Sequence, residues 1–204
     1  KGPWLYTQNK KKFLDFASGI AVNSLGHSNP LLIKALNEQS KKLWHTSNLY
    51  RISEQEKAAK KLCKISFADN VFFCNSGAEA TDGVIKIIRK FHYANGNSKK
   101  KKVIVFDNAF HGRTLTGILA GSSKKHREGF LPHSKSSGGF IRTNFDSIDS
   151  LKNMITEETA GIFIEPIQGE GGINVIPKKY LTEMRKICNQ HNILMALDEV
   201  QCGI

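Results

Sequence analysis

Short apolar segments alternate with longer amphipathic ones over most of this chain, and this alternation limits the folds open to it. Three apolar segments read KVIVFDN at 102–108, AGIFIEPI at 160–167 and ILMALDE at 193–199. The segments 77–94 and 178–191 have the length and the apolar spacing of helices. Strands that are apolar along nearly their whole length and alternate with helices are typical of a parallel sheet covered on both faces. We therefore predict an α/β fold with a mostly parallel sheet sandwiched by helices.

Apolar residues predict three more elements in the same region. They are strands at 70–76 (NVFFCNS) and 139–145 (GFIRTNF) and a short helix at 149–155. The helix at 77–94 places Val84, Ile87, Ile88 and Phe91 on one side. Since one stripe of such a helix faces the core, we expect these four side chains to be buried.

The first part of the chain is less regular. Two short strands are predicted on either side of a polar turn at 7–12, and Asn29 marks the start of a helix. A second helix is predicted at 53–65, because Ser53 is a suitable N-cap and Glu56 follows three residues later.

The charge of the chain raises the question of a nucleic-acid partner. There are 30 basic and 18 acidic residues, which give a formal net charge of +12, and nucleic acid is attracted by such a charge. The lysines are scattered, however, and the one run, 99–102, has no interleaved aromatic residue that could stack on bases. We therefore expect a solvated, lysine-rich surface and no nucleic-acid partner.

The cysteines bear on the compartment. Cys63, Cys74, Cys188 and Cys202 form no CxxC pair and no spacing with histidine that suits zinc. Neither a signal peptide nor a long apolar span is evident. We predict a reduced, cytoplasmic setting, without a metal ion and without a membrane partner.

Ligands of open parallel sheets bind just beyond the carboxyl ends of the strands. The first stretch to follow a predicted strand is NSGAEA, in which Ser76, Gly77 and Ala78 open a helix. Free backbone N–H groups and the helix dipole favour an anion such as phosphate there. The alternative is that Ser76 is an ordinary N-cap with Glu79 in the capping-box position.

The second stretch, FDNAFHGRT, offers an aromatic ring and a guanidinium. Phe110 is either a core residue or an aromatic face for a flat ligand. Arg113 has a fork that suits a carboxylate, with a surface salt bridge as the competing explanation. A lone histidine in a loop is more often structural, so we assign His111 no catalytic role.

The last two stretches supply carboxylates. Glu165 and Glu170, five residues apart in IEPIQGEGG, fit either a general acid and base or the scaffold of a tight turn. Asp198 stands at the tip of an apolar strand, where a carboxylate is costly unless it has a cationic partner. A metal ion is one candidate partner, and a protonated ring nitrogen, as in pyridoxal-phosphate enzymes, is another.

In order and spacing, CNSGAEA, AFHGRT, EPIQGEGG and LDEVQCG resemble the class III (ω-amino-acid) aminotransferases of the fold type I pyridoxal-phosphate group. FASGIAVNSLGHSNP and KLWHTSNLY resemble the same family, so the resemblance covers essentially the whole chain. It implies pyridoxal 5'-phosphate as cofactor. It also implies an N-terminal segment of the small domain or interface at 1–50 and an incomplete large, cofactor-binding domain at 51–204.

The resemblance assigns the cofactor contacts residue by residue. Gly77 and Ala78, with Ser76 beside them, match the loop that holds the cofactor phosphate. Phe110 matches the aromatic residue stacked on the cofactor ring, and Val200 matches the residue that packs on its other face.

Four further residues match by resemblance. Asp198 matches the partner of the pyridine nitrogen, and Gln201 the residue beside the 3-hydroxyl group. Arg113 matches the arginine that holds the substrate carboxylate, and Glu170 the glutamate that gates a second arginine. A glycosidase-like role for the paired glutamates is then not expected, since the acid–base group of this family is a lysine.

Within the family, the stretches lean toward the acetylornithine aminotransferases. The implied reaction moves the terminal amino group of N-acetylornithine to 2-oxoglutarate, which becomes glutamate, in arginine biosynthesis and by a homodimer. Ornithine, succinylornithine and 4-aminobutyrate aminotransferases are alternatives, as is a non-catalytic remnant of such an enzyme. None of the lysines lies at the family's Schiff-base position, downstream of DEVQ. We therefore expect part of an enzyme that does not transaminate alone.

Overall fold

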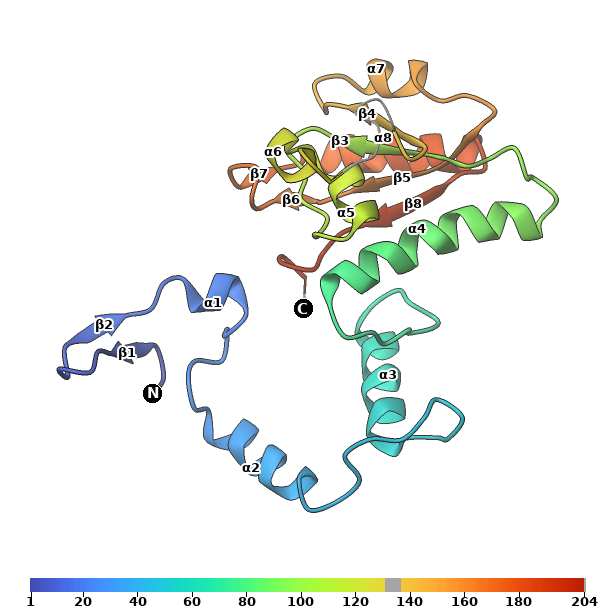
Figure 1. Cartoon of the computed structure of the whole chain (residues 1–204). Coiled ribbons are helices and arrows are strands. Elements are labelled where there is room, and N and C mark those ends of the chain that lie inside the picture. The colour runs from blue at the N-terminus through green and yellow to red at the C-terminus, as the bar shows by residue number, and fades with distance from the viewer. Residues whose placement is uncertain (131–136, 204) are drawn as a thin grey trace. The chain divides into compact units, whose positions relative to one another are not determined.

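The computed structural model describes residues 1–130 and 137–203, and the chain divides into two compact units, Lys1–Phe73 and Cys74–Ile204. Figure 1 shows the course of the chain through its helices and strands. The two units are described separately below.

The second unit is built on a four-stranded sheet in which every pairing is parallel. The strands are β3 (Lys102–Phe106), β4 (Phe140–Thr143), β5 (Thr159–Ile164) and β8 (Leu194–Leu197), in the order β4-β3-β5-β8. A small antiparallel hairpin, β6 (Ile167–Gln168) with β7 (Asn174–Val175), follows β5. The predicted parallel sheet is therefore confirmed, and so are the strands predicted at 102–108, 139–145, 160–167 and 193–199.

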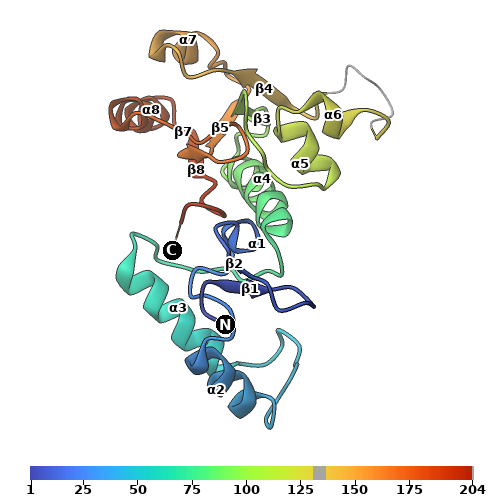
Figure 2. The same ribbon diagram turned by 90° about the vertical axis from the view of Figure 1, so that its left-hand side faces the viewer.

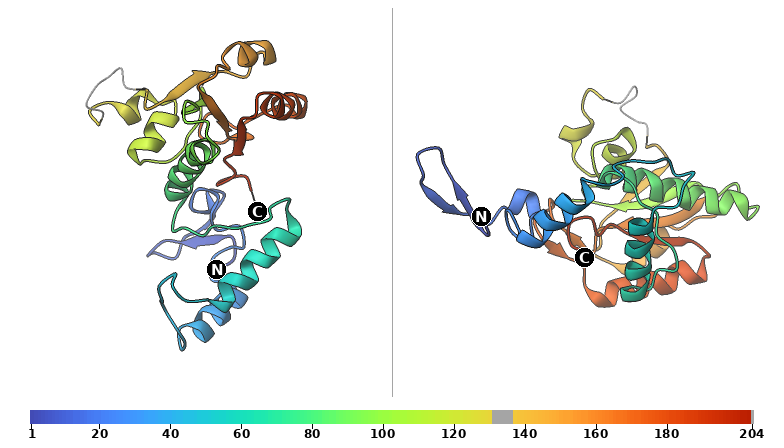
Figure 3. Two further views of the ribbon diagram at one scale, coloured as in Figure 1. Left: turned by 90° about the vertical axis from the view of Figure 1, so that its right-hand side faces the viewer. Right: turned by 90° about the horizontal axis from the view of Figure 1, so that it is seen from below.

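Helices cover both faces of this sheet, as the views along it in Figures 2 and 3 show. They are α4 (Gly77–Ala94), α5 (Leu115–Ala120), α6 (Lys124–Arg127), α7 (Ile148–Asn153) and α8 (Lys178–Gln190). On one face, Leu151 of α7 and Met184 of α8 pack in a core with Ile162 of β5. On the other face, Ile88 of α4 packs in a second core with Val103 of β3. The predicted sandwich is confirmed.

The buried face of α4 differs from the predicted one. The buried residues of this helix are Thr81, Ile85, Ile88 and His92, whereas Ile87 is 57% exposed and Phe91 is 41% exposed. Val84 is partly buried against the core. The sheet-facing stripe is turned because His92 Nε2 donates a hydrogen bond to the backbone oxygen of Ala160 in β5, at 2.7 Å. A hydrogen bond of this kind cannot be predicted from the pattern of apolar residues.

The prediction of a strand at 70–76 is wrong. Residues 71–74 have no regular secondary structure, and Phe72 is 77% exposed. An apolar run becomes a strand only when a neighbouring strand can take its backbone hydrogen bonds, and no described strand pairs with this segment.

The first unit contains the elements predicted for it. The hairpin of β1 (Trp4–Tyr6) and β2 (Lys12–Leu14) precedes a single turn, α1 (Ser18–Ala21), and the helices α2 (Pro30–Gln39) and α3 (Ser53–Ile65). Asn29 caps α2, since its side-chain oxygen accepts the N–H of Leu31 at 2.9 Å.

The capping box predicted for α3 does not form. The N-cap is Ile52, and the Ser53 hydroxyl donates to Glu54 instead. Glu56 is drawn away by Arg51, whose Nε lies 2.6 Å from a carboxylate oxygen. An ion pair with a preceding arginine therefore replaces the reciprocal cap.

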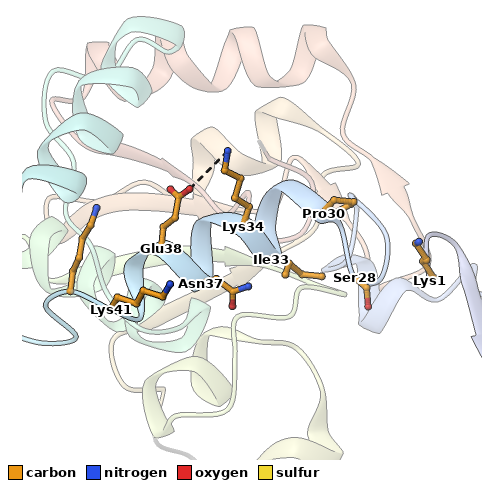
Figure 4. A pocket seen from close by; sticks show the side chains of 9 residues that line it. Lys1, Ser28, Pro30, Ile33, Lys34, Asn37, Glu38 and Lys41 are labelled. Carbon is orange, nitrogen blue, oxygen red and sulfur yellow. Dashed lines mark ion pairs between the residues drawn. The ribbon is translucent and has the colours of Figure 1, made fainter.

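Residues 1–73, all of which the structure describes, contain no side chain that is fully buried. A shallow hollow runs beside α2, where Ile33 and Asn37 lie near an ion pair of Lys34 with Glu38 at 3.9 Å (Figure 4). Because it is lined mainly by surface lysines and polar side chains, this hollow offers no buried chemistry.

Among residues 1–130 and 137–203, no helix has both the length and the apolar character that crossing a membrane requires.

Candidate functional site

The carboxyl ends of β3, β5 and β8 meet at one edge of the sheet. The chain adds β4 on one side of β3 and then β5 and β8 on the other side, so the direction of winding reverses between β3 and β5. Ligands bind at such switch points in open α/β sheets. The stretches after these strands, 108–113, 165–172 and 198–201, are the ones that the sequence singled out.

Asp198 follows β8 directly and is held by a histidine. His111 Nδ1 lies 2.7 Å from Asp198 Oδ2, and the exposed fractions of the two side chains are 0% and 8%. The other carboxylate oxygen accepts the backbone N–H of Val200 at 3.2 Å. Within the chain, the side-chain hydrogen-bond partner of Asp198 is therefore His111.

The imidazole of His111 is fixed from a second side. Its ring stacks on Phe163 of β5, with a centroid distance of 4.1 Å and an interplanar angle of 26°. Its Nε2 atom is buried and has no hydrogen-bond partner among the described residues. Stacking and the bond to Asp198 together define the orientation of this ring.

Glu165 joins the same cluster from the end of β5. Its Oε2 accepts the backbone N–H of Phe110 at 2.9 Å. Burial raises the pKa of this carboxyl, and the nearby charge of Asp198 raises it further, while the hydrogen bond from Phe110 and the charge of His111 act in the opposite direction.

Gly77 and Ala78, at the first turn of α4, lie against the other stretches. A Cβ atom on Gly77 would stand 2.8 Å from Val200 Cγ1, and one on Gly112 would stand 3.2 Å from the Cα of Ala78. The start of α4 therefore borders both the residues after Asp198 and the turn after Phe110. A ligand of modest size at this edge could contact the helix start and Asp198 together.

Ser76 is the N-cap of α4, which was one of the two predictions for this residue. Its hydroxyl accepts the N–H of Glu79 at 3.2 Å, while the Glu79 carboxylate accepts the N–H of Asn75 at 2.6 Å. The capping contacts leave the next N–H groups of the helix directed outward from its first turn, where an anion is favoured.

The remaining predicted residues lie at the rim. The guanidinium carbon of Arg113, which is exposed, lies 5.4 Å from the centroid of the Phe110 ring. The side-chain amide of Gln201 occupies the space that a Cβ on Gly169 would need. Glu170 is exposed and forms no ion pair within the described residues.

Two residues of this cluster were given no defined role by reasoning from the sequence. His111 was set aside as a structural histidine, and Glu165 was left between an acid–base role and scaffolding. The sequence required a cationic partner for Asp198, but it did not identify His111 as the residue beside it. No sequence signal points to the contact of Glu165 with the Phe110 amide.

No group of three or more His, Cys, Asp and Glu side chains in the described ranges is arranged to hold a metal ion.

The comparisons with known proteins agree with this geometry. The model of the family Aminotransferase class-III matches residues 1–204. An acetylornithine aminotransferase of Agrobacterium fabrum is 50% identical over 204 residues, and one of Mesorhizobium japonicum is 52% identical over the same length. Both matches cover 100% of this chain and 50% of the relative, so the chain spans about half the length of these curated relatives.

Solved structures give the same result. The ornithine aminotransferase of Toxoplasma gondii, whose structure shows partial occupancy of PLP at its active site, has a TM-score of 0.92 at 31% identity and is covered over 48% of its length. The N-acetylornithine aminotransferase of Stenotrophomonas maltophilia has a TM-score of 0.83 at 36% identity and is covered over 50%. Each match covers 100% of this chain.

The fold is therefore that of the fold type I transferases, which depend on pyridoxal phosphate. The chain belongs to the class III aminotransferase family.

One prediction concerns the start of α4. In Gly77→Ala, the new Cβ must displace the exposed side chain of Val200. Since alanine suits a helix better than glycine, by about 1 kcal/mol, we expect little loss of stability. The affinity for pyridoxamine 5'-phosphate should fall about tenfold, which corresponds to about 1.4 kcal/mol. Fluorescence titration of the ligand measures this change.

Gly83→Ala is the matched control. Gly83 lies in the same helix, and a Cβ there would meet nothing within 4 Å. Its affinity should equal that of the unmodified chain. Equal affinities for the Gly77 and Gly83 variants would contradict the placement of the helix start at the ligand.

Proposed function

We propose that this chain forms the cofactor-binding part of an aminotransferase that moves the terminal amino group of N-acetylornithine to 2-oxoglutarate, with glutamate as product. The observation that carries the proposal is the buried pair of Asp198 and His111 beside the first turn of α4. The identity of 50% and 52% to acetylornithine aminotransferases supports the choice of substrate.

The residues present fit pyridoxal 5'-phosphate. Asp198 is a buried carboxylate whose position is fixed by a histidine and a backbone N–H, as a partner for a protonated ring nitrogen must be. Gly77 and Ala78 leave the start of a long helix open to a phosphate. When bound, the cofactor supplies an electron-withdrawing ring that eases the loss of a proton from the carbon next to the transferred amine.

Asp198 has the central role in this proposal. Its negative charge would favour the protonated form of the cofactor's ring nitrogen. His111 donates to the carboxylate and is stacked on Phe163, so the carboxylate cannot turn away. Burial of the pair strengthens the interaction because little water screens it.

The other residues bind and orient. Ser76 would complete the phosphate loop, Phe110 and Val200 would contact the cofactor ring, and Gln201 would contact its 3-hydroxyl group. Phe110 is half-buried and the other three are exposed, so their side chains are accessible to a ligand.

Arg113 and Glu170 serve the substrate. The planar fork of Arg113 suits a carboxylate of the amine donor or of 2-oxoglutarate. Because Glu170 is exposed, its charge is free to attract or release an arginine as the two substrates alternate.

The assembly proposed is a homodimer, and the location proposed is the cytoplasm. The homodimer follows from the family resemblance. The location follows from the lack of a CxxC pair in the sequence, which suits a reduced compartment. Light scattering of the purified protein measures the mass of the assembly.

The test of this function uses the protein expressed from its natural gene. Pyridoxal 5'-phosphate, 2-oxoglutarate and one amine donor are mixed, and glutamate formation is followed. N-acetylornithine should react faster than ornithine, N-succinylornithine or 4-aminobutyrate. A preference for ornithine would favour the second candidate, ornithine aminotransferase, of which the Toxoplasma gondii enzyme at 31% identity is an example.

A further inference from the structure

Glu165 is a buried carboxylate to which the proposed function assigns no role. It is 6% exposed and follows the last residue of β5. Ile164 is paired with Leu197 in the parallel register, and the N–H of Asp198 donates to the oxygen of Ile164 at 2.8 Å. Glu165 and Asp198 are therefore the next residues on two adjacent strands. Two carboxylates side by side in a buried place require a reason.

The contacts of Glu165 supply that reason. Its Oε2 accepts the N–H of Phe110 at 2.9 Å. Phe110 precedes His111, the partner of Asp198. This carboxylate at the end of β5 thus holds the turn after β3 beside Asp198.

The chemistry of the group matches this arrangement. An ionised carboxylate has only acceptors, so it takes the backbone N–H of Phe110 in a charge-assisted hydrogen bond. A glutamine has the same shape, but its neutral amide oxygen makes a weaker hydrogen bond than a carboxylate. An alanine would leave the N–H of Phe110 without this partner, at a site that is shielded from water.

We propose that Glu165 is a positioning residue, which holds the turn of Phe110 and His111 in place beside Asp198. The inference rests on the proposed function in one respect, because the site that this turn borders is taken to be the cofactor site. Glu165 acts through its contact with the backbone N–H of Phe110 and touches no reacting group.

The test compares the unmodified chain with Glu165→Gln and Glu165→Ala by hydrogen–deuterium exchange and by binding of pyridoxamine 5'-phosphate. In Glu165→Ala, amides in 107–113 should lose protection, while those of β3 and β8 keep it. In Glu165→Gln, the same amides should lose less protection, because the amide oxygen can still accept the N–H of Phe110. Affinity should fall about tenfold or more in the alanine variant, as is typical when a partner that orients a binding side chain is lost.

Glu157→Gln and Glu157→Ala are the matched controls. Glu157 is an exposed carboxylate just before the opposite end of β5, so both variants should leave exchange and affinity unchanged. If Glu165→Ala does not fold, Glu165→Gln decides, since it preserves the shape of the side chain.

Three results would overturn the inference. They are unchanged exchange in 107–113, a loss of protection that extends through β3 and β8, and a loss of protection in 107–113 with unaltered affinity. An unmodified chain that does not bind pyridoxamine 5'-phosphate would contradict the proposed function instead. The exchange data would then still decide whether Glu165 orders the turn of Phe110 and His111.

Discussion

Replacing Asp198 by alanine should abolish measurable binding of pyridoxamine 5'-phosphate and destabilise the second unit of the chain. The carboxylate is the proposed partner of the ring nitrogen, so its loss removes the main charge that the ligand ring meets. The variant also leaves the buried Nδ1 of His111 without its partner at 2.7 Å. Removing one partner of a buried pair costs about 3–5 kcal/mol in free energy of unfolding, which a urea titration measures.

Asp198→Asn separates the two effects. The amide retains an oxygen that can accept from His111, so the loss of stability should be smaller than for alanine. The negative charge is gone, so affinity for the ligand should still fall at least tenfold, or about 1.4 kcal/mol. An asparagine variant that binds as well as the unmodified chain would refute the role of the charge.

A double-mutant cycle with His111→Ala isolates the pair. If the two side chains act together, the double variant should lose less stability than the sum of the single losses, with a coupling of about 0.5–3 kcal/mol. Additive losses would mean that Asp198 and His111 contribute independently, in conflict with their contact in the structure.

The layers of the fold could be predicted because apolar patterns report burial directly. A segment such as 103–106 is apolar at every position, and only a strand covered on both faces accepts that composition. The turning of α4 could not be predicted, since the hydrogen bond from His92 to Ala160 joins residues 68 apart. The strand predicted at 70–76 does not form, although the segment is apolar. A strand also needs a neighbouring strand for its backbone hydrogen bonds.

The residues of the candidate site could be predicted only where the end of a strand could be recognised in the sequence. Asp198 was found because a carboxylate at the tip of an apolar strand is costly, and that argument needs only local sequence. The identity of its partner was not predictable, because His111 lies 87 residues away in a loop. The direction of that loop is set by contacts with Glu165 and Phe163, and neither leaves a periodic signal.

Replacing Phe163 by alanine should produce the other large effect. The ring is 2% exposed in the core beneath α4, and it stacks on the imidazole of His111. Truncating a buried phenylalanine to alanine costs about 3–5 kcal/mol in free energy of unfolding. The cavity also removes the flat surface that orients His111, so affinity for pyridoxamine 5'-phosphate should fall in the fraction that remains folded.

Phe163→Leu separates the effect of the aromatic ring from the effect of the volume that the side chain fills. A leucine fills most of the core space, so the loss of stability should be clearly smaller than the alanine value. It offers no flat face, so His111 gains freedom to tilt away from Asp198, and the affinity should stay below that of the unmodified chain. Full recovery of affinity with leucine would mean that packing alone matters, and that the stacking of Phe163 on His111 has no part in holding Asp198.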